Sequence, residues 1–115
     1  MLRVPDRQTP LVVLTTLATA DAARALVRRL VEDRVIACGT VVPGASSIYR
    51  WQGTITTDDE ALVVLKTVGA RWDALVAAIE RHHPYEVPEL LALPVSAGLP
   101  SYLAWVEAET AGAAA

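Results

Sequence analysis

The chain has 115 residues, a formal net charge of −3 at pH 7, 53% hydrophobic and only 20% charged residues, and a mean hydropathy of +0.36. We expect one domain over residues 1–115, with its core at about 11–108. The acidic balance argues against a nucleic-acid partner, and no apolar run approaches the roughly 20 residues that span a bilayer. The surplus of apolar residues instead predicts burial between copies of the chain.

The first strand and helix are predicted from a change of hydrophobic period. The apolar run 11–16 is typical of a strand buried on both faces. From Thr19 onward the apolar residues recur at helical spacing, and either Thr19 or Asp21 fits the N-cap position. The residues of this stripe are Ala23, Leu26, Val27, Leu30 and Val31.

A long hairpin is predicted next, with arms at 35–51 and 54–67 and a corner at 51–53. Pro43-Gly44 indicates a bend or bulge in the first arm, and Asp58-Asp59 a second irregularity. Both arms exceed the usual strand length of about 5–6 residues. Their ends therefore expose edges with which another chain can pair.

The second half of the chain predicts a helix after Gly69 that ends before Pro84, a short strand at 89–95, and a last helix from Pro100 to about Glu107. The apolar stripe of the first of these two helices consists of Trp72, Leu75, Val76, Ile79 and His83. The predicted fold class is α+β, with the ferredoxin-like order βαββαβ and a C-terminal helix. Such a domain covers one face of its sheet with helices and leaves the other face bare.

The densest cluster of metal-binding residue types lies at 82–89 and includes His82, His83 and Glu89. Imidazole and carboxylate ligands suit Cu(II), Zn(II) or Ni(II), and copper leads the general affinity order. Glu89 is the preferred carboxylate over Glu86, because it stands just before the apolar residues of the predicted strand and would point out of the end of the sheet. The alternative, which the sequence favours slightly, is that His83 is a hydrogen-bonded core residue and His82 faces solvent.

No catalytic residue is predicted, and we expect the protein not to be an enzyme. Cys38 stands among apolar residues, where a cysteine is more often a small buried hydrophobe than a nucleophile. A pairing of Cys38 with His82 or His83 is an alternative, but it has no recognisable orienting group or oxyanion hole. The lone cysteine and the polar first ten residues predict a cytoplasmic protein.

Aromatic residues and an arginine flank the hairpin corner. Tyr49, Arg50 and Trp51 either pin the strand register or anchor a contact between subunits, and the apolar surplus favours the contact. Trp105, on the last predicted helix, covers either the core or a neighbouring subunit.

Several segments together resemble the CutA family of divalent-cation tolerance proteins. The resemblance extends from Leu11 to about Glu107 with its motifs in the family's order. The segments that carry it are 34–38 (RVIAC), 42–53 (VPGASSIYRWQG), 65–67 (LKT), 83–90 (HPYEVPEL) and 102–105 (YLAW).

The resemblance implies a homotrimer similar in architecture to the PII signalling proteins, with hairpins wrapping neighbouring subunits, and a link to copper or other divalent metals. It implies no established reaction. By their positions in the matching segment, the metal ligands that it implies are either His82 or His83, together with Glu89. Some members have a cysteine near the end of the first strand, where this chain has Thr15 and Thr16, so a harder His/carboxylate site is expected.

The leading expectation is thus a non-catalytic homotrimer that binds a divalent cation, or a small ligand, in clefts between subunits near residues 82–89. Cu(II) is the first candidate and Zn(II) the second, and no organic cofactor is implied. The alternative is a PII-like signalling or scaffold module that docks a partner protein.

Overall fold

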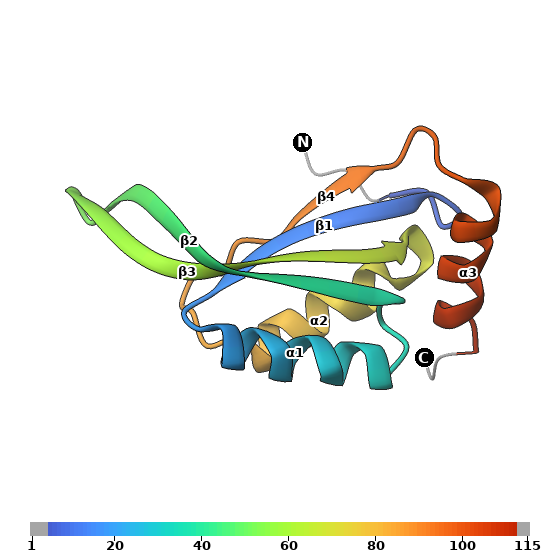
Figure 1. The fold of residues 1–115 in the computed structure, drawn as a ribbon, viewed down its shortest axis with the longest axis horizontal. Coiled ribbons are helices and arrows are strands. Elements are labelled where there is room, and N and C mark those ends of the chain that lie inside the picture. The colour runs from blue at the N-terminus through green and yellow to red at the C-terminus, as the bar shows by residue number, and fades with distance from the viewer. Residues whose placement is uncertain (1–4, 113–115) are drawn as a thin grey trace.

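The computed structural model describes residues 5–112 and has a four-stranded antiparallel sheet with strand order β2-β3-β1-β4. Helices α1 and α2 cover one face, and α3 lies at one end of the sheet (Figure 1). This arrangement confirms the predicted ferredoxin-like fold. The elements are β1 (Pro10–Leu17), α1 (Ala20–Glu32), β2 (Cys38–Trp51), β3 (Thr54–Val68), the 3₁₀ turn η1 (Gly69–Arg71), α2 (Trp72–His82), β4 (Leu91–Pro94) and α3 (Pro100–Thr110).

The core forms between the sheet and the two helices that cover it. Alternate residues of β1 and β3 point into it, as the pairing of Val13 with Leu65 illustrates. The other face of β1 is half-buried in the single chain. The prediction that β1 is buried on both faces is therefore wrong for one subunit, because helices cover only one side of the sheet.

The opposite face, which we call the bare sheet face, carries apolar side chains that are only partly covered. Leu91 and Leu93 of β4 are 57% and 50% exposed. They pair with Leu14 and Val12, which place their own side chains on the same face. The half-buried Leu62 and Val64 of β3 continue this face. Apolar surface of this extent is typical of an interaction site.

The hairpin of β2 and β3 extends far beyond the rest of the sheet (Figure 1). Its corner is a two-residue turn in which Gln52 and Gly53 both have positive φ, 49° and 81°, as a type I′ turn requires. The register shifts between Val42 and Ala45, which confirms the predicted bulge at Pro43-Gly44. No irregularity occurs at 58–59, because both aspartates pair regularly with β2.

Several predicted boundaries were wrong by a few residues. Strand β2 begins at Cys38 rather than Val35, because the backbone N–H groups of Val35 and Ile36 donate to Leu30 O at the end of α1. Strand β4 starts at Leu91, so Glu89 lies in the preceding loop. Helix α3 continues to Thr110 instead of ending near Glu107.

The sequence offers Thr19 and Asp21 as N-cap residues of α1, and the structure shows that Thr19 is the N-cap. Its side-chain oxygen accepts a hydrogen bond from the N–H of Ala22 at 3.1 Å. Helix α2 ends at His82. His83, which was predicted as the last residue of the apolar stripe of this helix, occupies the C-cap position instead.

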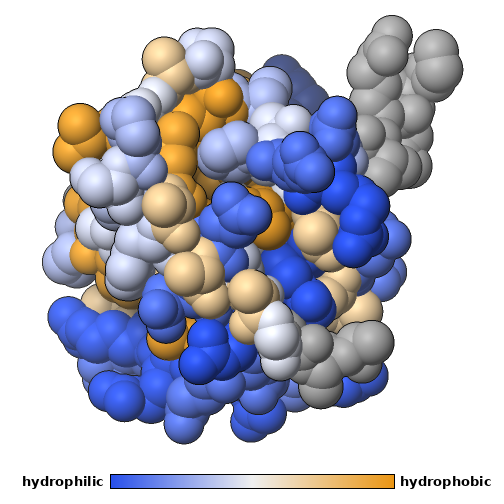
Figure 2. All heavy atoms as spheres, turned by 90° about the vertical axis from the view of Figure 1, so that its right-hand side faces the viewer, coloured by the Kyte–Doolittle hydropathy of each residue, from blue (hydrophilic) through white to orange (hydrophobic). Residues whose placement is uncertain are grey.

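Helix α3 lies at the end of the molecule that Figure 2 shows, where apolar side chains gather at the upper left and the right side and lower edge are mostly hydrophilic. Val106 turns inward and packs with Ala37 and Val68. Tyr102 and Trp105 remain 41% and 42% exposed. Among residues 5–112, none of the helices combines the length and apolar character needed to cross a membrane.

Candidate functional site

A half-open groove of about 770 Å³ lies along the hairpin, from Glu60 to Trp51 beside its corner, and against the end of β1 and the loop between α2 and β4. We call it the hairpin groove. Its aromatic lining consists of Tyr49, Trp51 and Tyr85. It is otherwise rich in carboxylates: Asp58, Asp59, Glu60, Glu86 and Glu89. This combination gives the groove a negative interior with stacking surfaces.

Glu60 is the most buried carboxylate of the groove, with only 8% of its surface exposed. The hydroxyl of Tyr85 donates a hydrogen bond of 2.6 Å to Glu60 Oε2. Burial by itself raises the pKa of Glu60, but the surrounding hydroxyl groups of Ser47, Tyr85 and Thr16 outweigh it and lower that pKa below its ordinary value. Glu60 is therefore held as a carboxylate inside the groove.

The two tyrosines of the groove are both tied to carboxylates. Burial, followed by the bond to Glu60, raises the pKa of Tyr85. The hydroxyl of Tyr49 donates to the carboxylate of Asp58 across the hairpin, and this bond raises the pKa of Tyr49. Both phenols consequently stay protonated at neutral pH and act as hydrogen-bond donors.

His83 is 8% exposed and uses both ring nitrogens within the fold. Its Nε2 lies 2.8 Å from the carbonyl oxygen of Thr16, and its Nδ1 accepts a hydrogen bond of 3.2 Å from the backbone N–H of Tyr85. A carbonyl can only accept and a backbone N–H can only donate, so in these contacts Nε2 is the donor and Nδ1 the acceptor. The ring also meets Tyr85 edge-on, with centroids 4.7 Å apart. His83 thus positions Tyr85 and the loop that follows.

The three predicted metal ligands occupy different places. Glu89 is exposed and lines the hairpin groove. His82 is half-buried in the last turn of α2 and is not part of the groove lining, and His83 lies behind Tyr85. Over residues 5–112, no group of three or more His, Cys, Asp or Glu residues is arranged to hold a metal ion.

Cys38 does not join a histidine. It pairs with Lys66 at the end of the sheet opposite Thr16, to which His83 is bonded. Its Sγ lies 3.5 Å from the hydroxyl of Tyr102 on α3. The Cys/His pair considered from the sequence is therefore not formed in this fold.

The four predicted interface residues are all exposed in the single chain. Tyr49 and Trp51 are each 39% exposed, and Trp105 is 42% exposed. Arg50 is also exposed and lies opposite Ile55 on the outer side of the hairpin. Their role as subunit contacts stays a prediction.

Sequence reasoning missed Glu60 and did not assign Tyr85 a role. The two-residue corner fixes the register from the pair Trp51 and Thr54 inward, so counting along both arms could have placed Glu60 beside Ala45 at the bulge. No local signal shows that the loop containing Tyr85 folds against this point, because the two residues are 25 positions apart in the chain.

Comparison with known proteins agrees with this architecture. A family model described as CutA1 divalent ion tolerance protein matches residues 11–109. The divalent-cation tolerance protein CutA of Thermus thermophilus is 42% identical over 99 residues, which cover 86% of this chain and 96% of that protein.

Solved structures show the same likeness. The crystal structure of CutA from Xylella fastidiosa has a TM-score of 0.86 and 38% identity, covering 89% of this chain and 98% of that one. CutA1 from Oryza sativa has a TM-score of 0.87 and 34% identity, covering 92% of this chain and 99% of that one. Sequence and fold together show that the chain belongs to the CutA1 divalent ion tolerance family.

Proposed function

We propose that this protein is a non-catalytic homotrimer that binds a divalent cation in the hairpin groove, close to where a neighbouring subunit completes it. The observation that carries the proposal is the carboxylate-rich groove in a chain of a divalent ion tolerance family. Cu(II) is the proposed ion, with Zn(II) second, because imidazole and carboxylate donors suit both. The lone cysteine fits a reducing compartment, so the proposed location is the cytoplasm.

The proposed ligands are His82, His83 and Glu89. Glu89 needs no rearrangement, since it already lines the groove. His83 could bind through Nδ1 by releasing the N–H of Tyr85, a bond whose length of 3.2 Å makes it the weaker of its two contacts. His82 would have to turn from the end of α2 toward the groove. When bound, the cation would neutralise the carboxylates that surround it.

The trimer is supported by two unpartnered apolar surfaces of the single chain. The bare sheet face presents Leu91 and Leu93, and the hairpin presents Ile48 and Ile55, which are 71% and 66% exposed. Covering such surfaces with copies of the same chain removes apolar area from water. Light scattering should give three times the chain mass of 12.3 kDa, and a monomer would refute the trimer.

Calorimetric titration with Cu(II) in a non-coordinating buffer tests the metal site. The wild type should bind with an affinity that falls in acid, because protonation of imidazole and carboxylate competes with the metal. The single variants His82→Ala, His83→Ala and Glu89→Gln should each weaken binding. Glu80→Gln, at an exposed position of α2 outside the groove, is the matched control. Unchanged binding in all three variants would refute the ligand assignment.

A second candidate function is a PII-like module that docks a partner protein through the groove, with metal binding incidental. The observation in its favour is Val87, which is 69% exposed on the rim beside the aromatic side chains. Binding of a defined partner that survives a chelator and is lost in Val87→Asp would support this function over the first.

A further inference from the structure

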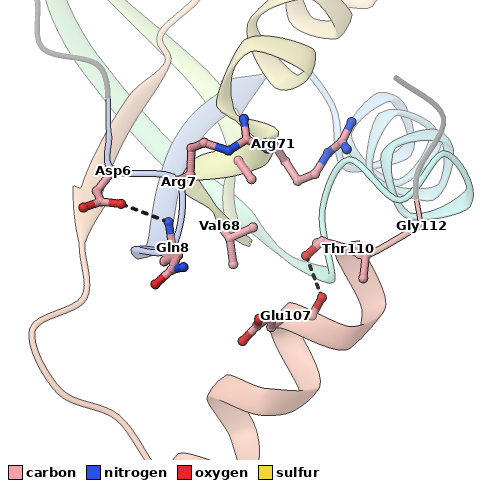
Figure 3. Close-up of a pocket in the computed structure, with 10 residues that line it drawn as sticks. Asp6, Arg7, Gln8, Val68, Arg71, Glu107, Thr110 and Gly112 are labelled. Atoms are coloured by element: carbon pink, nitrogen blue, oxygen red, sulfur yellow. Dashed lines mark hydrogen bonds between the residues drawn. The ribbon is translucent and has the colours of Figure 1, made fainter.

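A second pocket, of about 610 Å³, lies at the end of the sheet away from the hairpin groove. The segment before β1, the turn η1 and the C-terminal end of α3 form its walls (Figure 3). It contains two arginines, Arg7 and Arg71, and we call it the arginine pocket. It shares no lining residue with the hairpin groove.

The backbone brings the two arginines together by a specific pairing. The N–H of Gly69 donates to Thr9 O at 2.9 Å, and the N–H of Ala70 donates to Arg7 O at 2.8 Å. Gly69 is required for this approach, because a Cβ there would collide with the carbonyl oxygen of Asp6. Residues 6–9 are thus held against η1, which places Arg7 next to Arg71.

The positive charges of the pocket are not neutralised within the described part of the chain. Among residues 5–112, the ion pairs involve Arg24 and Arg34 but neither Arg7 nor Arg71. In addition, Nε of Arg71 is sealed from solvent and has no hydrogen-bond partner among residues 5–112. Because Nε is closed off by protein atoms, a ligand in the pocket would bind the terminal guanidinium nitrogens of Arg71, which carry four of its five N–H donors.

The two acidic residues of the lining do not fill this role. The carboxylate of Asp6 accepts a hydrogen bond from the backbone N–H of Gln8 and is turned away from both guanidinium groups (Figure 3). Glu107 lies across the pocket, on α3, and its carboxylate also points away from them (Figure 3). Neither of these two carboxylates therefore pairs with the arginines across the space that separates the arginines from α3.

We propose that the arginine pocket binds the phosphate group of a small phosphorylated molecule. Guanidinium groups present planar forks of donors that match phosphate oxygens, and two of them suit a doubly charged group. The volume of about 610 Å³ exceeds that of phosphate alone and leaves room for the rest of such a molecule. This site is separate from the proposed cation site and does not depend on it.

Titration of the ¹⁵N-labelled full chain with inorganic phosphate tests the proposal. We expect saturable chemical-shift changes at the Arg71 Nε–H and at the amides of Ala70 and Thr110, and none from sodium chloride at matched ionic strength. Acetate should bind more weakly, because it carries one charge.

Variants then assign the effect to the two arginines. Arg71→Gln and Arg7→Gln should each weaken phosphate binding by at least about tenfold, since a charge-assisted hydrogen bond is lost. Arg28→Gln removes the same charge from an exposed position of α1 outside both pockets and should leave binding unchanged.

Three outcomes would overturn the proposal. Phosphate and chloride could produce the same shifts, Arg28→Gln could weaken binding as much as Arg71→Gln, or the shifts could cluster at the hairpin groove. The wild-type titration decides the first and third of these even if a variant does not fold.

Discussion

Two buried threonines on neighbouring strands provide a matched test of how hydrogen bonding stabilises this core. Thr15 of β1 and Thr67 of β3 are both 0% exposed and point to the same face of the sheet. Within the described part of the chain, Thr15 Oγ1 has no hydrogen-bond partner, whereas Thr67 Oγ1 donates to Val35 O at 2.8 Å. Replacement by valine keeps the shape and removes the hydroxyl in both cases.

The two substitutions should change the free energy of unfolding in opposite directions. Thr15→Val removes a hydroxyl that was desolvated without compensation, so we expect a gain of about 1–2 kcal/mol. Thr67→Val removes the donor of a buried bond and leaves the carbonyl of Val35 without it, so we expect a loss of about 1–3 kcal/mol.

Urea unfolding followed by circular dichroism measures both changes. Protein concentration must be the same in each experiment, because the unfolding of the proposed trimer would depend on it. The urea concentration at the unfolding midpoint should rise for Thr15→Val and fall for Thr67→Val, while the dependence of the free energy of unfolding on urea stays similar in both variants. A destabilised Thr15→Val would refute the reasoning, since it would mean that the Thr15 hydroxyl is satisfied in the folded protein.

Three further predictions concern the groove, the packing of η1 and the hairpin. The pKa of Glu60 is lowered on folding, so its contribution to stability is present above the unfolded-state pKa and is lost as the pH falls through the folded-state pKa. Urea titrations should therefore show that the free energy of unfolding falls less from about pH 7 to about pH 3 in Glu60→Gln than in the wild type. An equal fall in both proteins would contradict this role of Glu60. Gly69→Ala should lower the free energy of unfolding by about 2 kcal/mol or more, because the new methyl group would collide with backbone atoms. Gly98→Ala is the control and should cost less, because its methyl group meets only the side chain of Leu103. If the proposed trimer forms through the hairpin, Trp51→Ala should weaken its association by at least about tenfold in sedimentation experiments. Unchanged association would exclude Trp51 from the proposed interface.

Features that depend on neighbouring residues could be read from the sequence. The helical stripe that includes Leu26 and Leu30 predicted α1, because it repeats at the period of a helix. The Gln52-Gly53 corner and the Pro43-Gly44 bulge were also predicted correctly, since positive φ and a missing backbone donor are local properties of these residue types. Element order then led to the ferredoxin-like fold.

Boundaries were less predictable, because competing hydrogen bonds decide them. Val35 and Ile36 have the composition of a strand, but their N–H groups bond to Leu30 O and keep them out of β2. His83 has the spacing of the α2 stripe, but Pro84 follows it, and the helix ends one residue earlier.

Tertiary structure alone decided which residues come together in the hairpin groove. The sequence grouped His82, His83 and Glu89 because they are close in the chain, whereas the fold separates them and joins Glu60 to Tyr85 across 25 positions. Arg7 and Arg71 likewise meet only because the segment before β1 pairs with η1. The physical reason is that pattern and turn chemistry act over a few residues, whereas burial and the direction of a side chain are set by whichever distant segment packs against it.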